Sequence, residues 1–293
     1  MDRTDPSQVA PYFDALLARL DAGEPRARAA FGRHVHWGWW PEPERASGTA
    51  EDYGEAAERL CLKVCDAAGL RDGMRVLDVG CGIGGTLASI NERFRGMDLV
   101  GVNIDPRQLE RAARTVRPAN GNRIAWVEAD ACALPFGPQS FDAVLAVECV
   151  FHFPSRAAFL AGAGKVLRPG GRLALSDFVP PAEAVPLLRQ ASAGLDEATR
   201  LSYGKVDLCC PEEEYRDLAN PAGMDLVALE DVTAGIMPTY PFLVADHRAW
   251  ADRAAARVYE KATTRLEKAC RTGLLRYSIL GFGRRAGAAR SAA

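Results

Sequence analysis

The chain predicts an α/β fold in which a seven-stranded, mostly parallel sheet carries helices on both faces. Between Arg75 and Asp177, short runs rich in β-branched and other apolar residues alternate with helical stretches. Such alternation is the pattern of βαβ units. A glycine-rich turn from Gly80 to Gly85 follows the first run and precedes a helical stretch. Glycines at such a turn permit tight backbone geometry and let a ligand approach the main chain closely.

Five strands and three helices are expected in this central region. The strands are predicted at 75–79, 98–103, 124–128, 141–148 and 172–177, and the helices at 84–94, 106–116 and 155–167. The third helix should end in the segment 167–171, because Pro169 cannot continue a helix and the glycines after it accept turn geometry. Strands at 226–233 and 274–284, separated by a polar helical segment over 246–270, would complete the sheet.

The flanking segments predict helical covers for this core. We expect residues 1–69 to supply N-terminal helices, one from a Ser7 cap to Leu20 and one over 55–68, with an aromatic loop between them that covers the site. The helical pattern of 180–222 is interrupted by Pro180, Pro181, Pro186 and Pro211, which predicts a helical cap after the fifth strand. The expected units are N-terminal helices over 1–69, a cofactor-binding core over 70–178, a cap over 179–225, and completion of the sheet with a C-terminal helix over 226–293.

Composition limits the classes of partner. The 293 residues include 36 basic and 38 acidic side chains, a formal net charge of −2, which gives no electrostatic case for binding nucleic acid or an anionic membrane. No apolar run approaches the roughly twenty residues of a membrane span, and the N-terminus lacks the order of a secretion signal. We therefore expect a cytoplasmic protein that binds a small-molecule acceptor and neither nucleic acid nor membrane. A homodimer is left open.

Cysteines and histidines do not predict a metal site. The eight cysteines have no regular spacing, which indicates reduced and packed thiols. Cys61 and Cys65 could meet on one helical face, but four nitrogen or sulfur ligands are not visible together. His34 and His36 have no carboxylate or thiolate near them in sequence, so they form an incomplete site.

The glycine turn fits two kinds of cofactor. Gly80, Gly82 and Gly85 satisfy the G-x-G-x-x-G pattern of folds that bind nicotinamide dinucleotides. Asp78 lies two residues before the turn, where its carboxylate would repel a pyrophosphate but would suit a ligand with an ammonium group. The methionine part of S-adenosylmethionine carries such a group. The charge therefore favours S-adenosylmethionine, with an NAD(P)-dependent oxidoreductase as the alternative.

Five segments in order resemble class I S-adenosylmethionine-dependent methyltransferases of the small-molecule type. VLDVGCGIGG at 76–85 resembles that family's first motif, and the later segments lie at 100–105, 128–131, 141–144 and 167–171. The resemblance extends over residues 70–178. Within the family, the chain resembles the group of ubiquinone, sterol, tocopherol and natural-product O-methyltransferases. It implies a Rossmann-like sheet with an antiparallel last strand, bound S-adenosylmethionine and methyl transfer to a small molecule.

The resemblance also implies a set of cofactor-binding residues. Relatives often have an acid where this chain has Asn103, but an amide oxygen can also accept ribose hydroxyls, and Gln108 matches a glutamine of the natural-product type. Asp130 would accept the exocyclic amine of adenine while the Ala131 N–H meets the ring; the alternative for Asp130 is an ordinary turn aspartate. The expected set is Asp78, Gly80, Cys81, Gly82, Asn103, Ile104, Gln108, Asp130, Ala131 and Glu148.

His152 and Asp177 are the expected catalytic residues. His152 follows the fourth strand, where the acceptor and the methyl group should meet, and a neutral imidazole could remove a hydroxyl proton. Related O-methyltransferases often have two consecutive histidines here, and this chain has Phe151 in place of the first. Asp177 matches an acid that some relatives place beside the acceptor. The alternatives are a packed histidine and a strand-end aspartate.

The segment from His34 to Trp40 is dense in aromatic residues. It resembles an H-x-G-[YW]-W element that relatives fold over the cofactor, where aromatic rings would attract the sulfonium. The alternative is an N-terminal anchor packed on the sheet. The residues expected to contact the acceptor are Trp37, Trp39, Trp40, Tyr203 and Tyr240.

Together these observations predict S-adenosylmethionine-dependent methylation of a small molecule, with O-methylation of a secondary metabolite favoured and C- or N-methylation as alternatives. Positioning of the two reactants alone can supply about 7–11 kcal/mol of the barrier reduction. A cofactor-binding pathway protein without catalytic activity is the third hypothesis.

Overall fold

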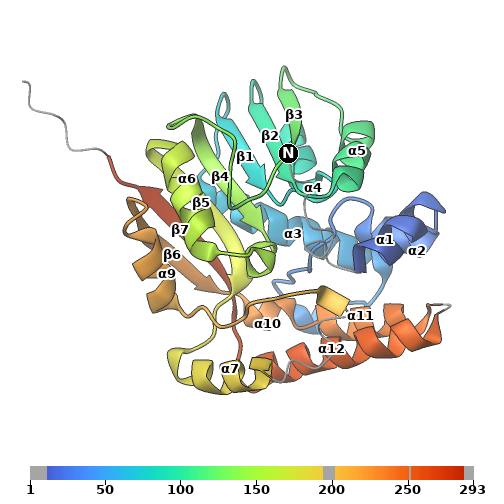
Figure 1. Ribbon diagram of the computed structural model, residues 1–293. Helices are drawn as coiled ribbons and strands as arrows, with labels where there is room; N and C mark the ends of the chain where they lie inside the picture. The colour runs from blue at the N-terminus through green and yellow to red at the C-terminus, as the bar shows by residue number, and fades with distance from the viewer. Residues whose placement is uncertain (1–11, 194–201, 251, 287–293) are drawn as a thin grey trace, which may run out of the picture.

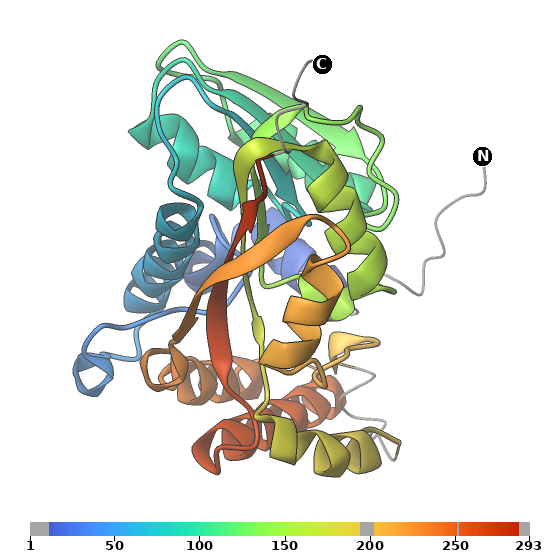
Figure 2. The same cartoon turned by 90° about the vertical axis from the view of Figure 1, so that its left-hand side faces the viewer.

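The fold is built on one seven-stranded sheet, seen in a computed structural model that describes residues 12–193, 202–250 and 252–286. The strand order is β3-β2-β1-β4-β5-β7-β6 (Figure 1). The first five strands are parallel, and β7 lies antiparallel between β5 and β6, as predicted (Figure 2). The strands are β1 (Arg75–Val79), β2 (Asp98–Asn103), β3 (Arg123–Glu128), β4 (Phe141–Val147), β5 (Leu167–Phe178), β6 (Met224–Asp231) and β7 (Tyr277–Arg284).

Helices cover both faces of the sheet. One buried cluster joins it to α3 and α4, and another joins it to α6 and α9. The central strands are therefore buried on both sides, which explains why their sequences are nearly continuous apolar runs. The larger helices are α1 (Tyr12–Asp21), α2 (Pro25–Phe31), α3 (Ala50–Ala68), α4 (Gly85–Arg93), α5 (Pro106–Thr115), α6 (Arg156–Val166), α7 (Val185–Ala193), α9 (Glu212–Ala219), α11 (Thr239–Arg248) and α12 (Arg253–Arg271).

Short polar side chains fix the start of several helices. Thr49 accepts from the Asp52 N–H at the start of α3, Ser155 accepts from Ala158 at the start of α6, and Asp252 caps α12. The remaining short helices are α10 (Thr233–Ile236), η2 (Pro43–Arg45), η3 (Val150–His152) and η4 (Ala182–Ala184). The predicted Ser7 cap lies outside the described residues, and α1 is described from Tyr12 onward.

Several predicted boundaries are wrong: α3 begins at Ala50 and not at 55, β7 begins at Tyr277 and not at 274, and two larger differences concern β5 and the segment 246–270. β5 begins at Leu167 rather than Arg172, because Leu167 already pairs with Phe141 before the register shifts. Residues 168–171 are left out of the pairing with β4, and Gly170 has a φ of 78°, so the expected turn geometry lies within the strand as an irregularity and does not precede it. The polar segment predicted as one helix over 246–270 is divided between α11 and α12, with Asp252 capping the second.

The helices that cover the carboxyl ends of the strands come mainly from the two ends of the chain. α11 packs along α12, and both lie beyond the sheet together with α1 and α2 (Figure 1). The expectation placed the whole of 179–225 in a cap, but α9 packs against α6 and β6 on the face of the sheet. A helix there is needed because β6 extends the sheet and its inner face must be buried.

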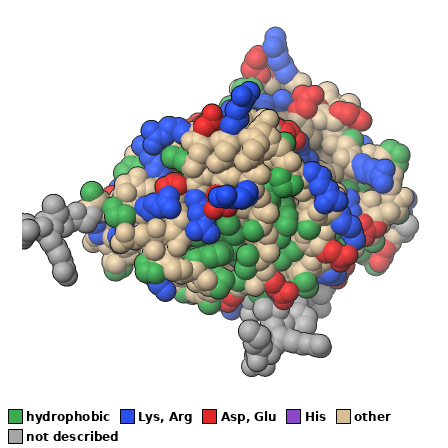
Figure 3. All heavy atoms as spheres, turned by 90° about the horizontal axis from the view of Figure 1, so that it is seen from above, with side chains coloured by type: hydrophobic (Ala, Val, Ile, Leu, Met, Phe, Trp, Pro, Cys, Tyr) green, Lys and Arg blue, Asp and Glu red, His purple; other side chains and the backbone are tan. Residues whose placement is uncertain are grey.

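The surface and the thiols agree with the composition. Basic and acidic side chains are interspersed over the face seen from above (Figure 3). All eight cysteines are free, as predicted. Within the described residues, no helix combines the length and apolar character that a bilayer crossing requires.

Candidate active site

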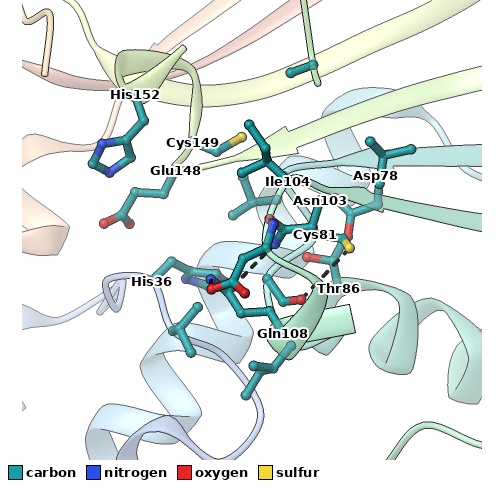
Figure 4. Close-up of a pocket in the computed structure, with 18 of the residues that line it drawn as sticks. His36, Asp78, Cys81, Thr86, Asn103, Ile104, Gln108, Glu148, Cys149 and His152 are labelled. Atoms are coloured by element: carbon teal, nitrogen blue, oxygen red, sulfur yellow. Dashed lines mark hydrogen bonds between the residues drawn. The ribbon is translucent and has the colours of Figure 1, made fainter. Parts of the chain in front are cut away.

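Two adjoining cavities lie at the carboxyl ends of the strands. The strand-end cavity encloses about 1030 Å³ of empty volume between the segment 33–36 and the turns that follow β1, β2, β3 and β4. It brings together all ten residues expected to bind the cofactor, several of which are labelled in Figure 4. The second, aromatic cavity is lined by residues of α1, α11, α12 and the segment 203–208. Tyr12, Val35, Glu148 and His152 line both cavities, and we call their meeting point the junction.

The glycine turn presents its backbone to the strand-end cavity. Gly80 and Gly82 have φ angles of 70° and 53°, a backbone conformation that residues with a Cβ rarely adopt. A Cβ on Gly80 would lie 2.8 Å from the Cys149 side chain. The N–H groups of Gly80 and Cys81 donate to the Val102 carbonyl at 2.8 and 3.0 Å, which fastens the turn to β2.

Asp78 is a buried acid without an ion-pair partner among the described residues. It is 1% exposed and lines the strand-end cavity, and its Oδ2 has no hydrogen-bond partner among the residues that the structure describes. Burial raises the pKa of Asp78 well above its ordinary value. Such a group is costly without a partner and becomes favourable when a ligand supplies a cation. The ammonium group of S-adenosylmethionine fits this requirement.

Asn103 and Gln108 form a coupled pair of amides. Asn103 Nδ2 donates to Gln108 Oε1 at 3.3 Å, and Gln108 Nε2 donates to Asp105 Oδ2 at 3.3 Å. The Asp105 N–H donates to Asn103 Oδ1 at 3.1 Å, which fixes that oxygen at the start of α5 while leaving it a second lone pair. The pair offers both donors and acceptors to a ribose, where relatives use an acid.

Asp130 makes a turn interaction and also lines the strand-end cavity. Its Oδ1 accepts from the Cys132 N–H at 2.8 Å, which is the turn interaction expected of an ordinary aspartate. Asp130 and Ala131 also line the strand-end cavity. Their position at the end of β3, one strand beyond Asn103, suits an adenine ring that lies past the ribose.

His152 lies at the junction on the short helix η3 after β4 (Figure 4). Burial lowers the pKa of His152 to about 4, although a hydrogen bond with the Lys205 backbone opposes the shift. The ring is therefore neutral at pH 7. A backbone hydrogen bond that favours the protonated form of His152 must be made to a carbonyl oxygen. One ring nitrogen of His152 therefore donates its proton to the Lys205 carbonyl, and the other ring nitrogen keeps a lone pair.

Glu148 also lies at the junction, although the sequence indicated only a cofactor contact. Its φ of 52° is unusual for a residue with a side chain. Glu148 Oε2 accepts from the Trp37 N–H at 2.8 Å and from the Tyr277 hydroxyl at 3.0 Å. Burial raises the pKa of Glu148 to about 8, while these two donors oppose the rise. One strained residue thus connects β4, the aromatic loop and β7.

The aromatic loop divides between the two predicted roles. Trp37 lines the aromatic cavity, whereas Trp39 and Trp40 lie outside both cavities and anchor the loop, so the structure does not bring these two to the place expected for the acceptor. Trp40 Nε1 donates to Asp52 at 3.1 Å, and the Trp39 N–H donates to the Ala56 carbonyl at 2.9 Å, so both are held on α3.

The two tyrosines expected to contact the acceptor also differ. Tyr203 lines the aromatic cavity and its hydroxyl pairs with Thr263 Oγ1 at 2.9 Å. Tyr240 lies behind Trp37, with ring centroids 4.9 Å apart, and its hydroxyl contacts Cys270 Sγ at 3.1 Å. Tyr240 therefore supports the wall of the cavity without forming it.

Asp177 does not reach the junction, and the expected catalytic contact is wrong. It is fully buried, and Arg156 donates to its Oδ2 through Nε at 3.2 Å and through Nη2 at 3.0 Å. The Tyr215 hydroxyl donates to the same oxygen. Arg156 also binds Asp207, so this group ties β5 to α6, α9 and the segment that lines the aromatic cavity. The strand-end carboxylate has a structural partner on the other side of the sheet.

Sequence reasoning missed most of the aromatic cavity. Its wall comes from helices whose residues are distant in sequence, such as Leu16 of α1, Leu243 of α11 and Tyr259 of α12. His34, considered as a metal ligand, instead binds Glu58 through Nε2 at 2.7 Å. In the described part of the chain, no group of three or more potential ligands could hold a metal ion.

Comparisons with known proteins assign the class. Residues 77–175 match the family model of a methyltransferase domain. The chain is 34% identical to the methyltransferase GfsG of Streptomyces halstedii over 80% of this chain and 78% of that one. It is 33% identical to the 27-O-demethylrifamycin SV methyltransferase of Amycolatopsis mediterranei over 82% of each. The chain belongs to the class I S-adenosylmethionine-dependent methyltransferases.

Solved structures agree with the fold. The [4+2]-cyclase SpnF has a TM-score of 0.74 at 24% identity, covering 97% of this chain and 98% of that one. A geranyl diphosphate C-methyltransferase from Streptomyces coelicolor, solved with S-adenosylhomocysteine, has a TM-score of 0.69 at 17% identity, covering 97% and 100%. The methyltransferase relatives show that the protein is an enzyme that transfers a methyl group from S-adenosylmethionine to a small molecule. The solved structures show that its sheet is shared by proteins of several chemistries.

Asp78→Asn should stabilise the empty protein while weakening cofactor binding. An acid whose pKa is raised by folding binds more protons in the folded state, so wild-type stability falls as pH rises above about 3.9. The amide removes that loss, and we expect a higher Tm than wild type at pH 7. S-adenosylhomocysteine should bind about 10- to 100-fold more weakly because a charge-assisted hydrogen bond is lost. Calorimetric titration and thermal unfolding measure both; equal affinity would contradict the assignment.

Asp177→Ala should act on stability and leave the cofactor site unchanged. Removing one partner of a buried ion pair costs about 3–5 kcal/mol, because Arg156 is left with an incomplete set of acceptors. Chemical denaturation measures this loss, and the affinity for S-adenosylhomocysteine should remain that of wild type. A variant of normal stability without methyl transfer would restore the catalytic assignment.

Proposed function

We propose that this chain O-methylates a small-molecule secondary metabolite bound in the aromatic cavity. The observation that carries the proposal is that the two cavities meet at His152, a neutral imidazole able to accept a proton. Relatives support the oxygen acceptor: besides the rifamycin enzyme, the erythromycin 3''-O-methyltransferase of Saccharopolyspora erythraea is 29% identical over 89% of this chain and 82% of that one.

The strand-end cavity would hold the cofactor through residues at successive strand ends. Asp78 would bind the ammonium group, Asn103 and Gln108 the ribose, and Asp130 with the Ala131 N–H the adenine. Gly80 and Gly82 line this cavity and, without side chains, would let the ligand approach their backbone. When bound, S-adenosylmethionine supplies an electrophilic methyl group and a positive charge that is lost from sulfur as the methyl leaves.

His152 would accept the proton of the acceptor hydroxyl at the nitrogen that does not face Lys205. With a pKa of about 4 the imidazole is a weak base in the empty cavity, because burial disfavours its charged form. The net charge of the site does not change during transfer, because the imidazole becomes positively charged as the sulfonium becomes neutral. Glu148, at the same junction, stabilises the imidazolium electrostatically when it is ionised.

Specific observations bear on the rival functions, which are other reactions on the same fold and an oxidoreductase. The solved relatives include a C-methyltransferase and a cyclase, so the fold alone does not decide the reaction. For the oxidoreductase alternative, the Asp78 carboxylate, whose Oδ2 has no partner among the described residues, would oppose a pyrophosphate at the glycine turn. Titration with NADH beside S-adenosylhomocysteine separates the cofactors, and tight binding of NADH alone would overturn the proposal.

The expected cytoplasmic location and the homodimer remain proposals. The small-molecule acceptor and the lack of a membrane-crossing helix in the described residues are compatible with both. Size-exclusion chromatography with light scattering tests the assembly.

His152→Ala should separate proton removal from cofactor binding. General-base catalysis contributes about 10²- to 10⁴-fold, so kcat should fall by that factor with a hydroxyl acceptor identified by screening with labelled S-adenosylmethionine. The affinity for S-adenosylhomocysteine should stay unchanged, because the ring is not expected to hold the cofactor. Full activity of this variant would leave positioning as the explanation and remove the assigned base.

A further inference from the structure

We propose that the aromatic cavity accepts an uncharged, largely hydrocarbon molecule with a hydroxyl at the junction and a second uncharged hydrogen-bonding group that pairs with His247. The inference rests on the proposed function, because it assigns the acceptor class of the same methyl transfer. It concerns the part of the cavity away from the junction, which is formed by α1, α11 and α12.

The wall of the aromatic cavity is mostly aromatic and aliphatic. Its rings come from elements spread along the whole chain, and leucines and two valines complete the apolar lining. Six of these ring-bearing residues are Phe31, Tyr53, Phe151, Phe178, Trp250 and Tyr259. Binding to such a wall is favoured by the burial of apolar surface, and the wall offers few interactions that would compensate a strongly hydrated ligand for its desolvation.

The charged groups on this wall are already paired. Arg19 is the one arginine or lysine among the described residues that line the cavity. It binds Glu24 through Nε and Asp246 through Nη1, both at 2.7 Å. Asp246 also accepts from Arg26 at 3.1 Å and from Trp250 Nε1 at 3.2 Å. Among the described residues of this wall, a phosphate or carboxylate on the acceptor would find no cation that is not already shared by two carboxylates.

His247 differs because it lacks a full set of partners. It is 6% exposed, its ring packs against Trp250 and Tyr259 at centroid distances of 5.0 and 5.3 Å, and it lines the aromatic cavity. Its Nδ1 is buried without a hydrogen-bond partner among the described residues. An unpartnered buried nitrogen destabilises the empty protein, and a ligand that supplies the partner removes that cost.

The charge state of His247 selects the kind of partner. Burial lowers the pKa of His247 to about 4, so the ring is neutral at pH 7 and carries one donor and one acceptor. A hydroxyl or carbonyl group pairs with a neutral ring. A carboxylate would favour the protonated ring, which burial opposes. His247 and the apolar wall therefore both indicate an uncharged ligand.

The test uses straight-chain probes on the protein saturated with S-adenosylhomocysteine. Trp37 and Trp250 line the cavity, so quenching of tryptophan fluorescence reports binding. The probes are 1-decanol, decanoate, decyl phosphate and a series of α,ω-alkanediols of increasing length. We expect decanol to bind at least about tenfold more tightly than the two anions, since no cation compensates their desolvation. One diol should bind about three- to tenfold more tightly than the alcohol of equal length.

His247→Phe should abolish the preference for the diol and leave the affinity for decanol unchanged. Phenylalanine keeps the ring between Trp250 and Tyr259 and removes the unpartnered nitrogen, so its Tm should equal or exceed that of wild type. His247→Gln is the matched control, because it retains a donor and an acceptor and should keep part of the preference.

The outcomes separate this inference from the proposed function. With S-adenosylhomocysteine bound, equal binding of the anionic probes, a diol preference that survives His247→Phe, or no binding of any alcohol would each overturn the acceptor class. Failure of S-adenosylhomocysteine to bind would overturn the proposed function instead.

Discussion

The geometry of the site depends on the hydrogen bonds of Glu148. It accepts from the Trp37 N–H and the Tyr277 hydroxyl, while its own N–H donates to Ser176 Oγ at 3.0 Å. These contacts join the end of β4 to the N-terminal loop, to β7 and to β5. They hold a residue with positive φ at the point where the cavities meet, at a cost in backbone strain and desolvation. The position of His152 follows, because η3 begins two residues later.

Unpartnered polar groups lie on the walls of both cavities. Asp78 Oδ2 and His247 Nδ1 are buried without partners in the described structure, whereas Asp177 and Asp246 have several donors each. In a packed protein nearly all buried polar atoms are hydrogen-bonded, so an exception that also lines a cavity is a place where a ligand can supply the missing partner. The protein gives up stability at these two points in exchange for binding.

Local patterns were enough to predict the core of the fold. The strand-turn-helix around Gly80, the polar strand ends at Asn103 and Asp130, and the antiparallel last strand follow from spacing and family resemblance, and the structure shows these elements. Long-range packing was not predictable in the same way. A strand-end acid can face either side of the sheet, and Asp177 faces Arg156 because α6 and α9 cover that side. The aromatic cavity depends on how α1, α11 and α12 pack, which no local period specifies.

The most direct test is a crystal structure with S-adenosylhomocysteine. The account predicts the amino group within hydrogen-bonding distance of Asp78 Oδ2, the adenine beside Asp130, and the sulfur facing the junction between Glu148 and His152. A sulfur atom that faces away from the aromatic cavity, or an amino group remote from Asp78, would contradict it.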